Sequence, residues 1–118
     1  MRTVTLFRHA KASDKDNLNV EDFDRPLSDR GLKAAPKMGM AMRDRDLRPS
    51  LILCSPSVRT RQTLALTQAM AWDNPPETRF EKKIYEASPQ TLLKLVRGCP
   101  DDAWHVMIVG HNPGLQDL

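Results

Sequence analysis

The side chains best suited to chemistry in this sequence are two arginines and two histidines that follow short apolar segments. Arg8 and His9 come directly after "VTLF", and His111 comes directly after "MIVG". Arg59 lies five residues beyond the apolar run "LILC". A guanidinium binds phosphate oxygens as a two-pronged donor, and a neutral imidazole can attack phosphorus to form a covalent intermediate. These residue types therefore favour chemistry on a phosphoryl group.

The elements that must position these residues are short strands alternating with helices. Residues 3–8, 51–54 and 105–111 are rich in apolar and β-branched residues and are predicted to be strands, with 78–84 as an edge strand. The alternation predicts an α/β fold with a mainly parallel sheet and helices on both faces. Ligands of such sheets bind beyond the carboxyl ends of the strands, so the four residues are expected to converge there.

The first predicted helix begins after Ser28, a good N-cap, and runs to about residue 46. Its spacing predicts an inner face, and Pro36 inside it is expected to kink or interrupt the helix. The residues of that predicted inner face are Leu32, Ala35, Gly39 and Met42.

Two further helices are predicted from their capping residues. One follows Ser55 or Ser57, with Pro56 in its first turn. Its expected apolar positions are Leu64, Leu66 and Met70. The other spans 88–98, from Ser88 and Pro89 to Gly98, and a last helix is predicted to begin within 112–118.

Composition excludes several classes of function. The 118 residues fit one domain, 1–118, and the net charge is only +3. Lysine and arginine are interspersed with acidic residues, so we expect no nucleic-acid partner, while a small anionic substrate is compatible with this balance. No apolar run is long enough for a signal peptide or a membrane span, and the two cysteines form no Cys-x-x-Cys pair and no zinc-binding pattern. We therefore expect a cytoplasmic protein with no membrane partner, metal or cofactor.

Four ordered motifs resemble those of a known family. "LFRHAKAS" (6–13) resembles the Arg-His signature of the histidine phosphatase superfamily, which has the phosphoglycerate-mutase-like fold, and its Ala-Lys continuation resembles the SixA-like phosphohistidine phosphatases. "DRPLSDRG" (24–31), "CSPSVRTRQT" (54–63) and "IVGHNPG" (108–114) resemble the superfamily's later motifs, in order and spacing.

This resemblance implies roles for the candidate residues. His9 would be the nucleophile that accepts the phosphoryl group, and Arg8, Arg59 and His111 would surround its oxygens. The physical logic agrees, because cationic donors stabilise the charge that spreads over the oxygens in the transition state. The same cations disfavour a protonated His9 and so keep it nucleophilic. The implied substrate is phosphohistidine on a partner protein or a small phosphorylated metabolite.

The resemblance also suggests candidates for the general acid and for a further contact with the substrate. The mutase-like branch of the superfamily uses a glutamate, and Glu86 in "IYEAS" falls in the matching region, with a surface role as its alternative. Asp14 and Asp16 are further candidates for the acid. Lys11 is a candidate for contact with the substrate. The alternative is that Lys11 is a solvated surface lysine.

The sequence departs from the superfamily's pattern in two respects. The family usually continues past its second histidine with a helix and a strand, whereas this chain ends seven residues after His111. The resemblance thus implies a domain that is incomplete at its C-terminus. The chain also lacks the long insertions that build a lid in relatives, which argues against a mutase.

Three alternatives remain beside the phosphohistidine phosphatase. One is a small-molecule phosphomonoesterase of the same superfamily. Another is a binding module that holds phosphoryl groups without catalysis. The third is a cysteine-based phosphatase using Cys54 and Arg59, but only four residues separate them, and one is Pro56, which has no N–H to donate to a phosphate.

Overall fold

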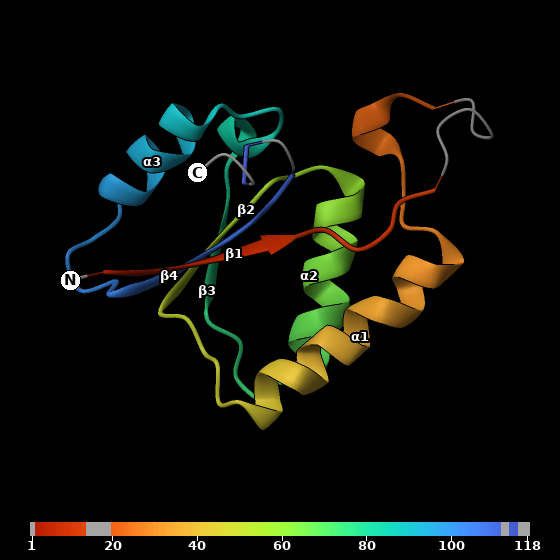
Figure 1. Cartoon of the computed structure of the whole chain (residues 1–118), viewed down its shortest axis with the longest axis horizontal. Helices are drawn as coiled ribbons and strands as arrows, with labels where there is room; N and C mark the ends of the chain where they lie inside the picture. Colours follow the sequence, from red (N-terminus) through yellow and green to blue (C-terminus); the bar gives the residue numbers. More distant parts are fainter. Residues whose placement is uncertain (1, 14–19, 112–113, 116–118) are drawn as a thin grey trace. The chain divides into compact units, whose positions relative to one another are not determined.

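The computed structural model describes residues 2–13, 20–111 and 114–115. Within them, strands and helices alternate along the chain (Figure 1). Their bounds are β1 (Thr3–Arg8), α1 (Asp29–Asp44), β2 (Leu51–Cys54), α2 (Val58–Ala71), β3 (Glu77–Phe80), α3 (Pro89–Arg97) and β4 (His105–Gly110), with two short 3₁₀ turns, η2 (Asp22–Asp24) and η3 (Lys82–Ile84).

The chain divides into two compact units. The sheet unit comprises Met1–Arg8, Pro49–Pro56 and Pro76–Leu118, and therefore contains all four strands and α3. The helical unit comprises His9–Arg48 and Ser57–Pro75 and contains α1, α2 and η2. The chain first passes from the sheet unit to the helical unit at the peptide bond between Arg8 and His9.

The sheet unit is built on four parallel strands in the order β1-β4-β2-β3 (Figure 1). The register pairs Arg8 with Gly110 and Cys54 with Val109, so the carboxyl ends of β1, β4 and β2 lie at one edge. This arrangement confirms the predicted α/β class with a parallel sheet. The predicted edge strand at 78–84 is β3, which is shorter than expected because 82–84 form the turn η3.

The core of the sheet unit lies on one face of β2 and β4. Alternate residues of a strand point to the same face, and α3 contributes Leu92 and Val96 to the cluster they form. The strand residues in this cluster are Leu51, Leu53, Val106 and Ile108. Burying each such side chain contributes about 1.5–3 kcal/mol, which fixes α3 on the sheet. The predicted boundaries of α3 are confirmed, with Ser88 as N-cap, Pro89 first and Gly98 as C-cap.

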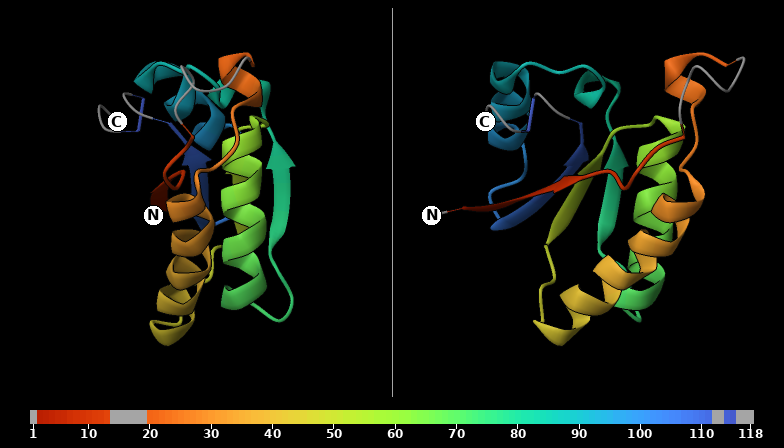
Figure 2. Two further views of the ribbon diagram at one scale, coloured as in Figure 1. Left: turned by 90° about the vertical axis from the view of Figure 1, so that its right-hand side faces the viewer. Right: turned by 45° about the vertical axis from the view of Figure 1, so that its right-hand side comes forward.

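In the helical unit, α1 and α2 pack side by side (Figure 2). The predicted inner face of α1 is confirmed for Ala35, Gly39 and Met42, which are all buried. It is wrong for Leu32, which is 41% exposed, and Gly31 is buried instead. A Cβ at Gly31 would come within 2.1 Å of the Lys11 carbonyl oxygen, so this position faces another backbone segment and has no room for a side chain.

The helix α1 runs without interruption through Pro36. Pro36 removes one backbone donor from the helix, while the residues on either side of it pack against α2. Ala35 accepts a hydrogen bond from Thr67 of α2, and Gly39 lies against the Thr67 carbonyl. These contacts keep both halves of α1 in place, and the expectation of an interruption is wrong.

The buried face of α2 differs from the predicted one and is largely polar. Leu64 is buried as expected, but Met70 is 40% exposed, and the capping residue is Ser57, so Pro56 precedes the helix. The buried face carries the hydroxyls of Thr60, Thr63 and Thr67. Each hydroxyl bonds to a backbone carbonyl, which offsets the cost of burying it.

Two further expectations concern the chain as a whole. In the part of the chain that the structure describes, no helix is long and apolar enough to cross a membrane. The helix predicted to begin within 112–118 falls mainly outside the described residues, of which Gly114 and Leu115 form a turn.

Candidate active site

Three residues, Arg8, Ser55 and His111, lie at the carboxyl edge of the sheet. Each belongs to the end of a different strand or directly follows it. Arg8 is the last residue of β1, Ser55 follows β2, and His111 follows β4. The backbone N–H of Ser55 donates to the Val109 carbonyl at 3.0 Å, which continues the sheet pattern one step beyond β2. The predicted convergence of strand ends is thus confirmed within the sheet unit for Arg8 and His111.

Arg8 presents an open cationic side chain at this edge. The residue is exposed, and it makes no side-chain hydrogen bond or ion pair with the described parts of the chain. Its backbone is fixed by pairing with Gly110 of β4. A guanidinium with its donors open to solvent is suited to binding an anion.

His111 is held between a serine and a tyrosine. Its Nε2 lies 2.8 Å from the Ser55 hydroxyl, and the Tyr85 ring meets it edge-on with a centroid distance of 5.4 Å and an interplanar angle of 83°. His111 is 9% exposed and Ser55 is fully buried, so the imidazole has a fixed orientation. Sequence reasoning missed both partners: Ser55 was considered only as a helix cap, and no motif pointed to Tyr85.

Glu86 lies beside Tyr85 in an unusual backbone conformation. Its φ is 57°, in the left-handed region, which costs a residue other than glycine on the order of 1–3 kcal/mol. The side chain is exposed and makes no hydrogen bond or ion pair with described residues. It lines a surface hollow of ≈ 680 Å³ together with Lys83, Ser88 and Lys94. Among the residues that the structure describes, no hydrogen bond or ion pair therefore orients the predicted acid.

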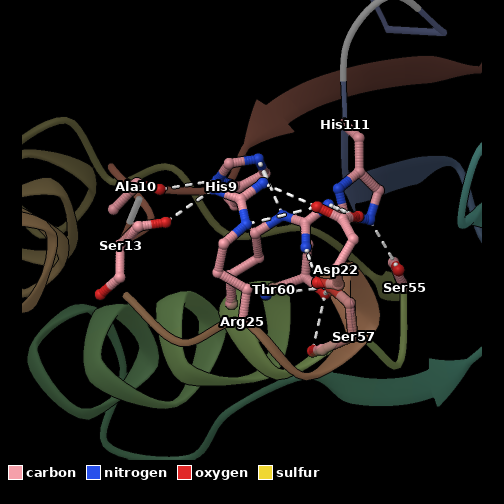
Figure 3. A network of polar contacts seen from close by, with 10 residues as sticks. His9, Ala10, Ser13, Asp22, Arg25, Ser55, Ser57, Thr60 and His111 are labelled. Atoms are coloured by element: carbon pink, nitrogen blue, oxygen red, sulfur yellow. Dashed lines mark hydrogen bonds and ion pairs between the residues drawn. The ribbon is translucent and has the colours of Figure 1, made fainter. Parts of the chain in front are cut away.

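His9 lies in the helical unit, where two contacts specify its tautomer. Its Nδ1 is 2.6 Å from the Ala10 carbonyl oxygen, and the Arg59 Nε–H donates to its Nε2 at 3.4 Å (Figure 3). A carbonyl only accepts, so Nδ1 carries a proton, and a guanidinium only donates, so Nε2 carries a lone pair. These two contacts are those of the tautomer with its proton on Nδ1 and its lone pair on Nε2.

Arg59 is buried in the second position of α2 and is bound to η2. Its two terminal nitrogens donate to the Asp22 carbonyl at 2.7 Å and to the Asp22 carboxylate at 3.1 Å. Arg25 donates to the other carboxylate oxygen at 2.9 Å (Figure 3). One carboxylate therefore lies between two guanidinium groups, with Arg59 5% exposed and the Asp22 side chain 36% exposed. Sequence reasoning missed Asp22 and Arg25, although Arg25 lies within the quoted motif "DRPLSDRG" and Asp22 lies two residues before it.

The segment that follows His9 is anchored through its backbone. The Ala10 N–H donates to the Thr63 hydroxyl at 3.0 Å, and the Lys11 carbonyl accepts from both the N–H and the hydroxyl of Ser28 at 2.9 and 3.0 Å. Lys11 itself is exposed, and its predicted contact with substrate stays a prediction.

The remaining candidates of the sequence analysis are two aspartates and a cysteine. Asp14 and Asp16 lie outside the described residues. Cys54 is fully buried at the end of β2, and its thiol donates to the Ser55 carbonyl at 3.3 Å. A buried thiol is a poor nucleophile, so the structure disfavours the cysteine-based alternative.

Comparisons with known proteins show the family of this chain. Residues 4–88 match the family model of the histidine phosphatase superfamily (branch 1). An uncharacterised protein of Mycobacterium tuberculosis is 35% identical over 106 residues, which cover 90% of this chain and 63% of that protein. The chain therefore spans less than two thirds of the length of this relative.

Two solved structures share both the fold and about a third of the sequence. One, from Agrobacterium tumefaciens, carries the provisional name phosphohistidine phosphatase SixA; it is 35% identical, with a TM-score of 0.87 over 97% of this chain and 71% of that one. A protein of the same provisional name from Nakamurella multipartitia is 34% identical, with a TM-score of 0.84 over 98% of this chain and 62% of that one.

Proposed function

This chain belongs to the histidine phosphatase superfamily, and we propose that it hydrolyses phosphoryl compounds through a covalent phosphohistidine at His9. The observation that carries the proposal is the tautomer of His9. The Ala10 carbonyl accepts from Nδ1 at 2.6 Å, which leaves the Nε2 lone pair directed toward the Arg59 side chain. An imidazole in this state needs no base before it attacks phosphorus.

The proposed reaction has two displacements at phosphorus. In the first, the Nε2 lone pair forms the N–P bond while the bond from phosphorus to the leaving group breaks. The ring then carries positive charge, which the Ala10 carbonyl stabilises by accepting from Nδ1–H. In the second, a water oxygen attacks phosphorus, the N–P bond breaks, and inorganic phosphate leaves with His9 neutral again.

Cations stabilise the oxygens of the transferred group in this proposal. We assign that role to Arg8, Arg59 and His111, because the reaction develops its charge on the equatorial oxygens. Arg8 is open to solvent at the sheet edge, whereas Arg59 is bound by Asp22. Phosphoryl binding therefore requires Arg59 to exchange the Asp22 carboxylate for a phosphoryl oxygen. No metal is needed for any of these steps, and we expect full activity after treatment with a chelator.

We further propose that the substrate is phosphohistidine on a partner protein, met in the cytoplasm. An alkoxide leaving group needs a well-placed acid, whereas an imidazole leaves readily once its free nitrogen is protonated. Glu86 is exposed and unoriented by any described contact, which suits a substrate with a good leaving group. The two SixA-named structures, each about a third identical to this chain, support the same class. Small phosphorylated metabolites remain the second candidate.

A substrate panel tests this function. Wild type and His9→Ala are assayed on a phosphohistidine protein, an aryl phosphate and an alkyl phosphate, with and without chelator. We expect His9→Ala to lower turnover by several orders of magnitude, as the loss of a nucleophile does. If the variant keeps more than about a tenth of wild-type turnover, His9 is not the nucleophile. Tight binding of phosphohistidine without turnover by the wild type would indicate the non-catalytic module.

A further inference from the structure

Thr63 connects the backbone beside His9 to the backbone of Arg59. Its hydroxyl donates to the Arg59 carbonyl at 2.7 Å and accepts from the Ala10 N–H at 3.0 Å. The donor and acceptor roles are unambiguous, because a carbonyl only accepts and an N–H only donates. Thr63 is fully buried, so water cannot replace either bond.

The residue that Thr63 holds is the one that sets the tautomer of His9. Ala10 has two polar backbone atoms: its N–H is bound by Thr63, and its carbonyl accepts from His9 Nδ1 at 2.6 Å. The next residue, Lys11, is anchored separately by Ser28. Ala10 is thus fixed through its own N–H on one side and through its neighbour on the other, so its carbonyl has a defined position.

From this chain of contacts we infer that Thr63 is a positioning residue that keeps His9 in its nucleophilic tautomer. Its hydroxyl bonds to two backbone groups and makes no hydrogen bond to the imidazole. It acts through the Ala10 backbone, whose carbonyl selects the proton on Nδ1 and thereby leaves the lone pair on Nε2. The catalytic consequence rests on the proposed function, whereas the effect on the tautomer does not.

The structure offers an isosteric test and a matched control on the same helix. Thr63→Val keeps the shape of the side chain but leaves the buried Ala10 N–H without an acceptor. Thr67→Val makes the same change one turn later, at a threonine that is equally buried and whose hydroxyl donates to Ala35 of α1 at 3.0 Å. Thr63→Ser keeps the hydroxyl and removes only the methyl group, so it tests whether the hydroxyl is the group that matters.

The first measurement is the ¹⁵N NMR spectrum of the His9 ring, which distinguishes protonated from unprotonated ring nitrogens. The His9 signals are assigned by their loss in His9→Gln. We expect the Nδ1–H tautomer in the wild type, in Thr63→Ser and in Thr67→Val, and a mixture of tautomers in Thr63→Val. An Nε2–H tautomer in the wild type would overturn the inference without any variant. An unchanged Nδ1–H tautomer in Thr63→Val would overturn it too.

The second measurement separates turnover from binding. Thr63→Val is expected to lower kcat by about tenfold, the effect of one buried hydrogen bond, while vanadate affinity stays within about twofold because Arg59 keeps its side chain. Thr63→Ser should recover kcat and Thr67→Val should not lose it. Equal loss of kcat in the Thr63→Val and Thr67→Val variants would reduce Thr63 to a structural role. A tautomer change in Thr63→Val without phosphatase activity in the wild type would uphold this inference and refute the proposed function.

Discussion

At the scale of the residue, the most consequential contact is the Asp22 carboxylate between Arg59 and Arg25. It supplies Arg59 with the negative charge that the proposed mechanism expects from a phosphoryl oxygen. With its side chain 36% exposed, Asp22 can return to water when a substrate anion arrives. In the proposed mechanism, the carboxylate then competes with the substrate for the Arg59 guanidinium.

We therefore predict that Asp22→Asn raises the affinity for phosphate and vanadate by about three- to tenfold, because removing one partly exposed charge next to Arg59 typically changes binding by about 1 kcal/mol. The measurement is inhibition by vanadate at low and high salt. The gain in vanadate affinity should become smaller at high salt, because salt screens the charges. Asp24→Asn is the matched control, since Asp24 lies exposed in the same turn and its side chain makes no hydrogen bond or ion pair with described residues. Weaker vanadate binding in Asp22→Asn would show instead that the carboxylate positions Arg59 for the substrate.

Glu86 carries a prediction about the leaving group. If Glu86 is the acid, Glu86→Gln should slow the hydrolysis of alkyl phosphates by at least about tenfold, because an alkoxide needs a proton as it leaves. Phosphohistidine and aryl phosphates, which have better leaving groups, should be affected much less. Rates for the three substrates are compared in the same preparation. Equal slowing of all three would refute the leaving-group argument, and efficient alkyl hydrolysis with phosphohistidine untouched would identify a small-molecule phosphatase.

At the scale of the element, the close crossing of α1 and α2 depends on Gly39. A Cβ there would lie 2.1 Å from the Thr67 carbonyl oxygen and 3.0 Å from the Met70 Cβ. Because the obstacle is backbone, the two helices would have to separate. Thr67 also donates to Ala35, so the separation would disturb that bond as well.

Gly39→Ala is accordingly predicted to destabilise the protein by about 1–3 kcal/mol, as overpacking does, despite the roughly 1 kcal/mol that alanine gains over glycine inside a helix. Urea unfolding gives the change in free energy. Gly98→Ala is the control, since its Cβ would come no closer than 3.4 Å to any neighbour and should change stability by less than about 0.5 kcal/mol. A Gly39→Ala variant as stable as wild type would show that the helices separate at no cost.

The elements themselves were largely predictable, because their ends carry explicit signals. Ser28 and Ser88 cap their helices as expected, and the apolar run at 51–54 is β2. The buried face of α2 was not predictable, because threonines such as Thr63 read as polar surface residues until their carbonyl partners are known. Leu32 was misplaced for a related reason: Gly31 is buried by a backbone contact that no hydrophobic pattern records.

At the scale of the whole molecule, the sequence predicted which residues the strand ends present. The parallel order β1-β4-β2 brings Arg8 and His111 to one edge, as the α/β pattern requires. The partners of His9 and Arg59 were not predictable: the Ala10 carbonyl that accepts from Nδ1–H of His9 depends on local backbone geometry, and the contact of Asp22 with Arg59 depends on the path of η2. The prediction of a single domain, incomplete at its C-terminus, stays a prediction.

The covalent intermediate is the central claim, and its position on the ring tests that claim most directly. The protein is mixed with a phosphorus-labelled substrate, quenched in base during turnover, and digested so that the labelled peptide can be identified. We predict an acid-labile, base-stable phosphoramidate on His9, with phosphorus on Nε2 because Nδ1 donates to the Ala10 carbonyl at 2.6 Å. His9→Gln should abolish the label. A label on His9 Nδ1, a thiol-linked label on Cys54, or turnover with no label on the protein would contradict the mechanism.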